Sequence, residues 1–155
     1  MSIPRKRPKD ERPRVQATNA ALASYTGAAV AWMTMIFAIS TISNIEQPGG
    51  LGGVPNIDKF EHMGLYFVLA AFISMALREH GLLKDPRWTG TQAPWTTALL
   101  AFTASTLYGL TDELHQFFVP GRTSDVGDLL MDAIGSILAS LLFMYLFVRM
   151  RTDAA

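Results

Sequence analysis

The sequence predicts an all-α integral membrane protein with four transmembrane helices, and three observations support this fold class. Half of the 155 residues are apolar and only 17% are charged. Residues 20–42 run for 23 positions without a charged side chain, which is long enough for a helix to cross the roughly 30 Å hydrocarbon core of a bilayer. Three further apolar segments follow. A core helix of a soluble domain is rarely this long or apolar on every face, so we predict a membrane protein.

The predicted helices follow a polar N-terminal segment. Residues 1–19 contain six Lys or Arg residues and three Pro residues, a composition that predicts a disordered, basic cytoplasmic tail. The remaining chain, 20–150, is predicted to be one four-helix membrane domain. We expect its helices over 20–42, 58–78, 94–117 and 125–148.

The connection between the third and fourth helices carries two local signals. In the sequence Val119-Pro120-Gly121-Arg122, Pro is preset for the second position of a tight turn and Gly tolerates a positive φ at the third. Ser124 or Asp125 is expected to cap the N-terminus of the fourth helix, because a side-chain oxygen there can accept hydrogen bonds from free backbone N–H groups.

The basic residues predict the orientation of the chain. Eleven of the 13 Lys and Arg residues lie in the tail, in the segment 78–93 or at the C-terminus, and only Lys59 and Arg122 lie on the other side. Loops rich in Lys and Arg stay in the cytoplasm, so we predict a multi-pass protein of the cytoplasmic membrane with both termini cytoplasmic. We expect the basic tail to contact anionic lipid headgroups, and we expect no nucleic-acid partner.

Polar side chains are concentrated where the second, third and fourth helices meet the extracytoplasmic side. At 100° per residue, each of these helices has one polar stripe, and a polar stripe in a membrane must face protein or water. We therefore predict a shared pocket that opens outward. The stripes are formed by Asp58, His62 and Tyr66; by Ser105, Tyr108, Asp112, His115 and Gln116; and by Asp128, Asp132, Gly135 and Ala139.

Acidic residues outnumber basic ones in this region. Seven carboxylates face Lys59, Arg122 and His62, and burying a carboxylate without a partner costs several kcal/mol. The excess leaves three alternatives open, namely protonated carboxyls, a bound divalent cation or a cationic ligand. The carboxylates that lie deepest, and are therefore the candidate metal ligands, are Asp112, Asp128 and Asp132.

The same segments resemble a known family. The motifs are DKFEHMGLY (58–66), DELHQFFVPGR (112–122) and DLLMDAIG (128–135), and together they are similar to the VanZ-like membrane protein family over roughly 20–148. Position 132 is Asp where that family usually has Asn. The resemblance implies a protein of the bacterial cell envelope, in a family whose founding member is associated with resistance to the glycopeptide teicoplanin.

Two main functions agree with these residues. The first is binding of a membrane lipid or a lipid-linked cell-wall precursor, with contacts from Tyr66, Tyr108, Glu113, Gln116, Arg122, Asp128 and Asp132. The second is a membrane enzyme for phosphotransfer or hydrolysis on a lipid-linked envelope substrate, with His62 as general acid or base, Asp58 orienting it and Asp112 as a further catalytic candidate. An ion-coupled transporter ranks third. The sequence leaves open the substrate, the cofactor, catalysis itself and whether the chain forms an oligomer.

Overall fold

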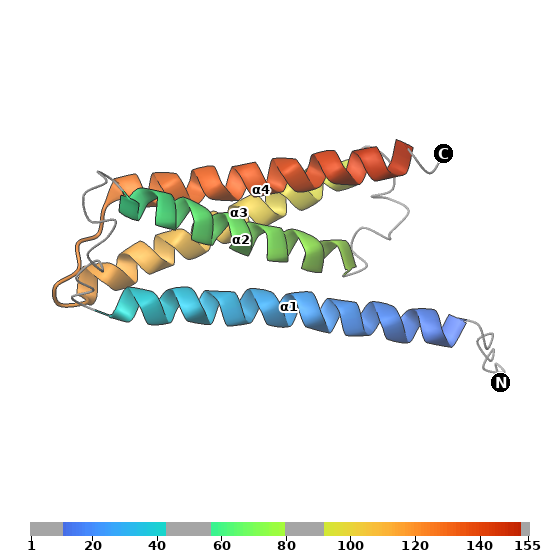
Figure 1. The fold of residues 1–155 in the computed structure, drawn as a ribbon, viewed down its shortest axis with the longest axis horizontal. Coiled ribbons are helices and arrows are strands. Elements are labelled where there is room, and N and C mark those ends of the chain that lie inside the picture. The colour runs from blue at the N-terminus through green and yellow to red at the C-terminus, as the bar shows by residue number, and fades with distance from the viewer. Residues whose placement is uncertain (1–10, 43–56, 80–91, 153–155) are drawn as a thin grey trace, which may run out of the picture.

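The all-α prediction is confirmed. The computed structural model describes residues 11–42, 57–79 and 92–152, with side chains over 24–42, 57–79 and 94–150. Within these ranges the chain forms four helices and no strand (Figure 1). They are α1 (Glu11–Thr41), α2 (Ile57–Glu79), α3 (Gln92–Phe118) and α4 (Val126–Thr152).

The four helices run alternately in opposite directions along one bundle. Figure 1 shows that α1 begins and α4 ends at the same end of the bundle. At the opposite end α1 and α3 finish, and α2 and α4 start. This arrangement places the acidic first turns of α2 and α4 beside the polar last turns of α3.

The observed helix boundaries agree with the prediction for α2, α3 and α4 to within a few residues, but α1 starts earlier than expected. We predicted a start at residue 20, and the helix begins at Glu11, so that the second half of the predicted tail is helical. Pro13 falls in the first turn, where a missing N–H does not interrupt the helix. Residues 1–10 lie outside the described part of the chain.

The connection between α3 and α4 has the predicted turn and cap. The Arg122 N–H donates to the Val119 carbonyl over 3.1 Å, and Gly121 has a φ of 84°, which a residue with a side chain rarely adopts. Asp125 is the N-cap of α4, because its side chain accepts a hydrogen bond of 2.8 Å from the Gly127 N–H. The seven residues of this connection, 119–125, return the chain into the bundle directly beside the polar end of α3.

Helix α2 is central and contacts all three of the other helices. It approaches α4 closely at Gly135, where an added Cβ would overlap the backbone carbonyl of Met63. Small residues at such positions let the backbones of two helices pack directly against each other. On its other side, α2 receives a hydrogen bond of 2.9 Å from the Trp32 indole of α1 to the Leu65 carbonyl. The contact at Gly135 therefore fixes how α4 is placed against α2.

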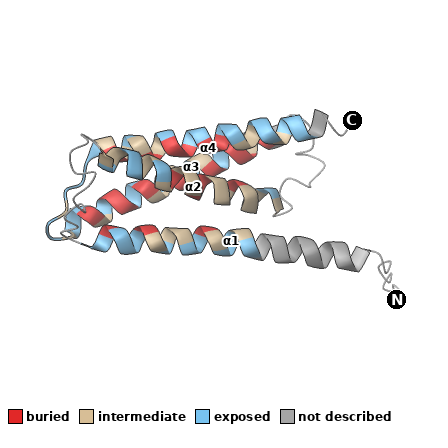
Figure 2. Cartoon of the chain, in the orientation of Figure 1, coloured by how far each residue is buried: buried red, intermediate tan, exposed pale blue. Residues whose placement is uncertain are grey.

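Among the described residues, two helices have the length and composition to cross a membrane. The most apolar windows of α2 and α4 have mean hydropathies of 1.6 and 2.0. Buried residues gather on the facing sides of the helices, while the outer side of α4 is exposed (Figure 2). That exposed side is largely apolar, with Leu130, Leu138, Leu142 and Leu146 all more than 40% exposed. A lipid environment suits an outer surface of this kind.

Candidate functional site

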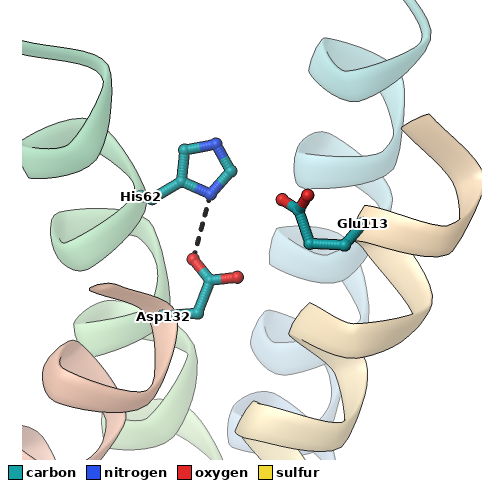
Figure 3. Close-up of side chains that lie close together, drawn as sticks. All are labelled: His62, Glu113 and Asp132. Carbon is teal, nitrogen blue, oxygen red and sulfur yellow. Dashed lines mark hydrogen bonds and ion pairs between the residues drawn. The ribbon is translucent and has the colours of Figure 1, made fainter. Parts of the chain in front are cut away.

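Three helices direct ionisable side chains into one buried space near the end of the bundle where α2 and α4 begin. His62 comes from α2, Glu113 from α3 and Asp132 from α4 (Figure 3). Each offers one nitrogen or carboxylate oxygen that could bind a metal, and these three atoms lie within 4.8 Å of one another. We call this group the His62–Glu113–Asp132 cluster.

Asp132 is the most deeply buried member of the cluster, with no exposed surface. One of its carboxylate oxygens, Oδ1, lies 3.0 Å from Nδ1 of His62. The other, Oδ2, has no hydrogen-bond partner and lies against α3 at Gly109, where an added Cβ would be only 2.7 Å away. Glycine at this position of α3 therefore makes room for the carboxylate.

Glu113 is held by the start of α4. Its Oε2 accepts hydrogen bonds from the Ser124 hydroxyl (3.1 Å) and from the Asp125 backbone N–H (2.9 Å). The side chain is 4% exposed, and Oε1 has no hydrogen-bond partner. The N-terminus of a helix favours a negative charge, so this carboxylate is both oriented and stabilised while one oxygen stays available.

A second set of charges lies one turn closer to the end of the bundle. Lys59 of α2 donates to Asp125 over 2.7 Å and to Asp128 over 3.0 Å. Its hydrogen bond holds the pKa of the Asp125 carboxyl below the usual value, because a nearby positive charge favours the ionised form. Asp128 and Asp132 follow each other on one face of α4 but have separate partners, Lys59 and His62.

The other predicted acidic candidate, Asp112, is not a member of this cluster. Asp112 is 4% exposed, and its Oδ2 accepts a hydrogen bond of 3.2 Å from Gln116, one turn later on α3. Its Oδ1 has no hydrogen-bond partner. Of the three acids predicted as metal ligands, the structure places only Asp132 in the group that could hold an ion, and Glu113 takes the place expected for Asp112.

Two predicted ligand-binding residues contact α1 instead of a shared pocket. The Tyr108 hydroxyl donates to the Met33 carbonyl over 2.6 Å, and Arg122 donates to the Ile39 carbonyl over 2.8 Å. In this position Arg122 is a second donor to a carbonyl in the last turn of α1 that also accepts from the Ile42 N–H, and basic side chains commonly bind the last carbonyls of a helix. Both residues therefore tie α1 to the bundle.

The predicted partner of His62 also differs. We expected Asp58 to orient the imidazole, but Asp58 is exposed and His62 pairs with Asp132. Residues one turn apart on one helix share a face, but Asp58 is too near the helix start to be buried with His62. Tyr66 follows His62 in the interior. Its ring stacks on the imidazole with centroids 6.5 Å apart, and its hydroxyl is buried without a partner.

Three residues that position the site were not among the predicted site residues, namely Gly109, Lys59 and Ser124. The sequence does contain a signal for Gly109, because Ser105, Gly109 and Glu113 follow one another at intervals of four on α3 and so share a face. This face contacts α4, as the hydrogen bond of 2.8 Å from Ser136 to Ser105 shows. No comparable pattern singles out Ser124, which acts from outside a helix.

A groove lies between α3 and α4 beside the cluster. It has a volume of about 370 Å³, within the range of small-molecule sites. Its apolar lining is formed by Leu110, Leu114, Phe117, Val126 and Leu129, and its polar lining by Glu113, Ser124 and Asp125. Because Glu113 belongs to both the groove and the cluster, the polar side of the groove adjoins the buried carboxylates.

Comparison with known proteins gives a family and no individual relative. The VanZ/LLP1 family model matches residues 17–148, which include all four helices apart from the first turns of α1 and the last turn of α4. Curated proteins and solved structures were also compared with the chain, and nothing in either group matched. The motifs, the family match and the two apolar helices agree: the chain belongs to the VanZ/LLP1 family and is a VanZ-like membrane protein.

Proposed function

We propose that this protein binds an amphiphile of the bacterial cell envelope, either a membrane lipid or a lipid-linked cell-wall precursor, in the groove between α3 and α4. The observation that carries the proposal is the composition of the groove, in which five apolar side chains adjoin Glu113, Ser124 and Asp125. An apolar chain fits the first set and a polar headgroup fits the second. Binding of a wall precursor would provide a physical link to teicoplanin resistance.

The proposal includes an orientation in the membrane. All four helices cross the bilayer, both termini are cytoplasmic, and the groove and the cluster are near the extracytoplasmic face. The distribution of Lys and Arg supports this orientation, with eleven such residues on one side and two on the other. A headgroup in the groove would then lie at the depth where envelope precursors present theirs.

Cysteine labelling tests the orientation, since the chain contains no cysteine of its own. Thr123 is exposed in the connection between α3 and α4, and Thr89 lies in the segment predicted to be cytoplasmic. A membrane-impermeant maleimide on intact cells should modify Thr123→Cys and spare Thr89→Cys, and permeabilised cells should show both. Labelling of Thr89→Cys alone on intact cells would place the groove on the cytoplasmic side.

Two leucines of α3 give a matched test of the groove. Leu110 lines it and is 51% exposed, whereas Leu107 is 56% exposed and lies outside it. Leu110→Trp should fill the groove and reduce the amphiphile that co-purifies in mild detergent by roughly fivefold or more, because the larger side chain occupies the site. Mass spectrometry of extracted lipid, per mole of protein, measures the change. Equal lipid content in Leu110→Trp and Leu107→Trp would show that the groove is not the binding site.

The His62–Asp132 pair supports a second candidate, a membrane enzyme acting on a lipid-linked envelope substrate. An imidazole with one nitrogen 3.0 Å from a carboxylate is oriented for proton transfer through its other nitrogen. In that case the co-purified amphiphile should be converted by the purified protein, and His62→Gln should accumulate it unconverted. Retention without conversion in both proteins favours binding alone.

A further inference from the structure

Two buried carboxylates in the His62–Glu113–Asp132 cluster are without a basic partner that balances them both. Asp132 and Glu113 are 0% and 4% exposed, and each keeps one oxygen with no hydrogen-bond partner. The two basic residues of this end are engaged elsewhere, Lys59 with Asp125 and Asp128 and Arg122 with the end of α1. Among the described side chains, the imidazole of His62 is the basic group placed with these carboxylates. Unpartnered buried carboxylate oxygens are costly, so the arrangement calls for a positive charge.

We propose that His62, Glu113 and Asp132 bind one divalent transition-metal cation of the Zn²⁺ type. Zinc accepts imidazole nitrogen at about 2.0–2.1 Å and carboxylate oxygen at about 2.0–2.2 Å. Such distances require ligand atoms roughly 3.0–3.5 Å apart, which is close to the separations of up to 4.8 Å that the three side chains already have. Side-chain rotations that shorten these separations would complete the site.

The surroundings of the ligands suit this role. Ser124 and the Asp125 N–H orient Glu113 through Oε2, which leaves Oε1 for the cation. Outer hydrogen bonds of this kind fix the direction of metal ligands and increase affinity. The room that Gly109 leaves allows the Asp132 carboxylate to lie between α3 and α4. The ligands thus come from three helices whose own packing holds them in position.

The donor set selects among cations. Mg²⁺ and Ca²⁺ prefer oxygen ligands only, whereas an imidazole with carboxylates suits zinc and its neighbours in the first transition series. Three protein ligands also leave a coordination position open, as in catalytic zinc sites. The cation site goes beyond amphiphile binding, because it concerns a different ligand and different residues except for Glu113.

Metal uptake by the full-length protein in detergent tests the site. After EDTA treatment and dialysis, equilibrium dialysis against Zn²⁺ with elemental analysis should give one bound ion per chain. Zn²⁺ at about one hundred times its Kd should raise Tm by about 5 °C or more, whereas equal concentrations of Mg²⁺ or Ca²⁺ should not. Absence of Zn²⁺ uptake by the wild-type protein would overturn the proposal.

Variants distinguish this ligand set from a nonspecific acidic surface. Glu113→Gln and His62→Gln should each lower the Zn²⁺ affinity at least about tenfold. Asp112→Asn is the matched control, since Asp112 precedes Glu113, is equally buried and also has a free oxygen, yet lies outside the cluster. It should retain the wild-type affinity. An equal loss in Asp112→Asn and Glu113→Gln would show that the cluster is not the site.

A spectroscopic measurement on the wild-type protein does not depend on whether the variants fold. Co²⁺ in place of Zn²⁺ should give visible absorption typical of mixed nitrogen and oxygen ligation, and Zn²⁺ should abolish it by competition. A spectrum unchanged from that of hydrated Co²⁺ would contradict the site. Since neither metal measurement uses a lipid, the cation site and the amphiphile groove can each fail alone.

Discussion

Replacing Gly135 with alanine is expected to be among the most destabilising single changes in this protein. The added Cβ would overlap the Met63 carbonyl of α2, and a backbone atom cannot rotate away as a side chain can. Separating α2 from α4 also loosens the contact that places Asp132 beside His62. We expect a loss of about 3 kcal/mol in the free energy of unfolding, even though alanine favours a helix over glycine by about 1 kcal/mol. Thermal unfolding in detergent measures it.

Gly64 of α2 provides the matched control, because it is exposed. It lies inside α2, seven residues after the helix begins, and an added Cβ would meet no atom within 4 Å. Gly64→Ala should therefore raise stability by about 1 kcal/mol or less, through helix propensity alone. If Gly135→Ala and Gly64→Ala had the same effect, the close approach at Met63 would not be what stabilises the bundle.

The second large effect is expected at Lys59. Its ammonium group is the basic partner of Asp128, whose side chain is only 11% exposed. Lys59→Met keeps much of the side-chain volume but leaves the Asp128 carboxylate without a counter-charge, and removing one member of a partly buried pair is destabilising. We expect Tm to fall by about 5 °C or more. The start of α2 should also separate from that of α4, which hydrogen exchange in this region would detect.

A double variant shows whether the loss arises from the uncompensated charge. In Lys59→Met/Asp128→Asn the carboxylate is neutral, so part of the lost Tm should return. Asp125→Asn is the control, because the Asp125 side chain is 50% exposed and exposed ion pairs contribute little to stability. This variant should change Tm little. A double variant no more stable than Lys59→Met would indicate that Lys59 acts through packing of its aliphatic part.

The two polar sets at this end of the bundle have different chemical roles. Lys59 with Asp125 and Asp128 is a closed network in which the acids share a cation supplied by the chain. The His62–Glu113–Asp132 cluster leaves two carboxylate oxygens free and borders the groove through Glu113. A ligand or ion is therefore expected to bind at the His62–Glu113–Asp132 cluster and not at the network of Lys59, Asp125 and Asp128.

Position 132 illustrates how the structure changes an expectation drawn from the sequence. Because Asp128 and Asp132 are four residues apart on α4, the sequence suggests two carboxylates that repel each other in one space. In the structure Lys59 neutralises one of them and His62 pairs with the other. The Asn that the resembled family usually has at position 132 could keep the hydrogen bond to His62. It would supply one negative charge less to a bound cation.

The sequence by itself determined the class of fold, the positions of α2, α3 and α4, the turn at Gly121 and the end of the molecule where polar residues gather. These features follow from local rules: apolar length, helical periodicity, N-capping and the φ that only glycine adopts easily. The tertiary structure decided which polar residues meet. Asp112 and Glu113 are neighbours in sequence, and a rotation of α3 by 100° about its axis exchanges them. Packing at Gly109 and the hydrogen bonds from Ser124 and Asp125 set that rotation. These contacts are made between different elements of the fold, and the helical period of one helix does not specify which residue of another element it meets.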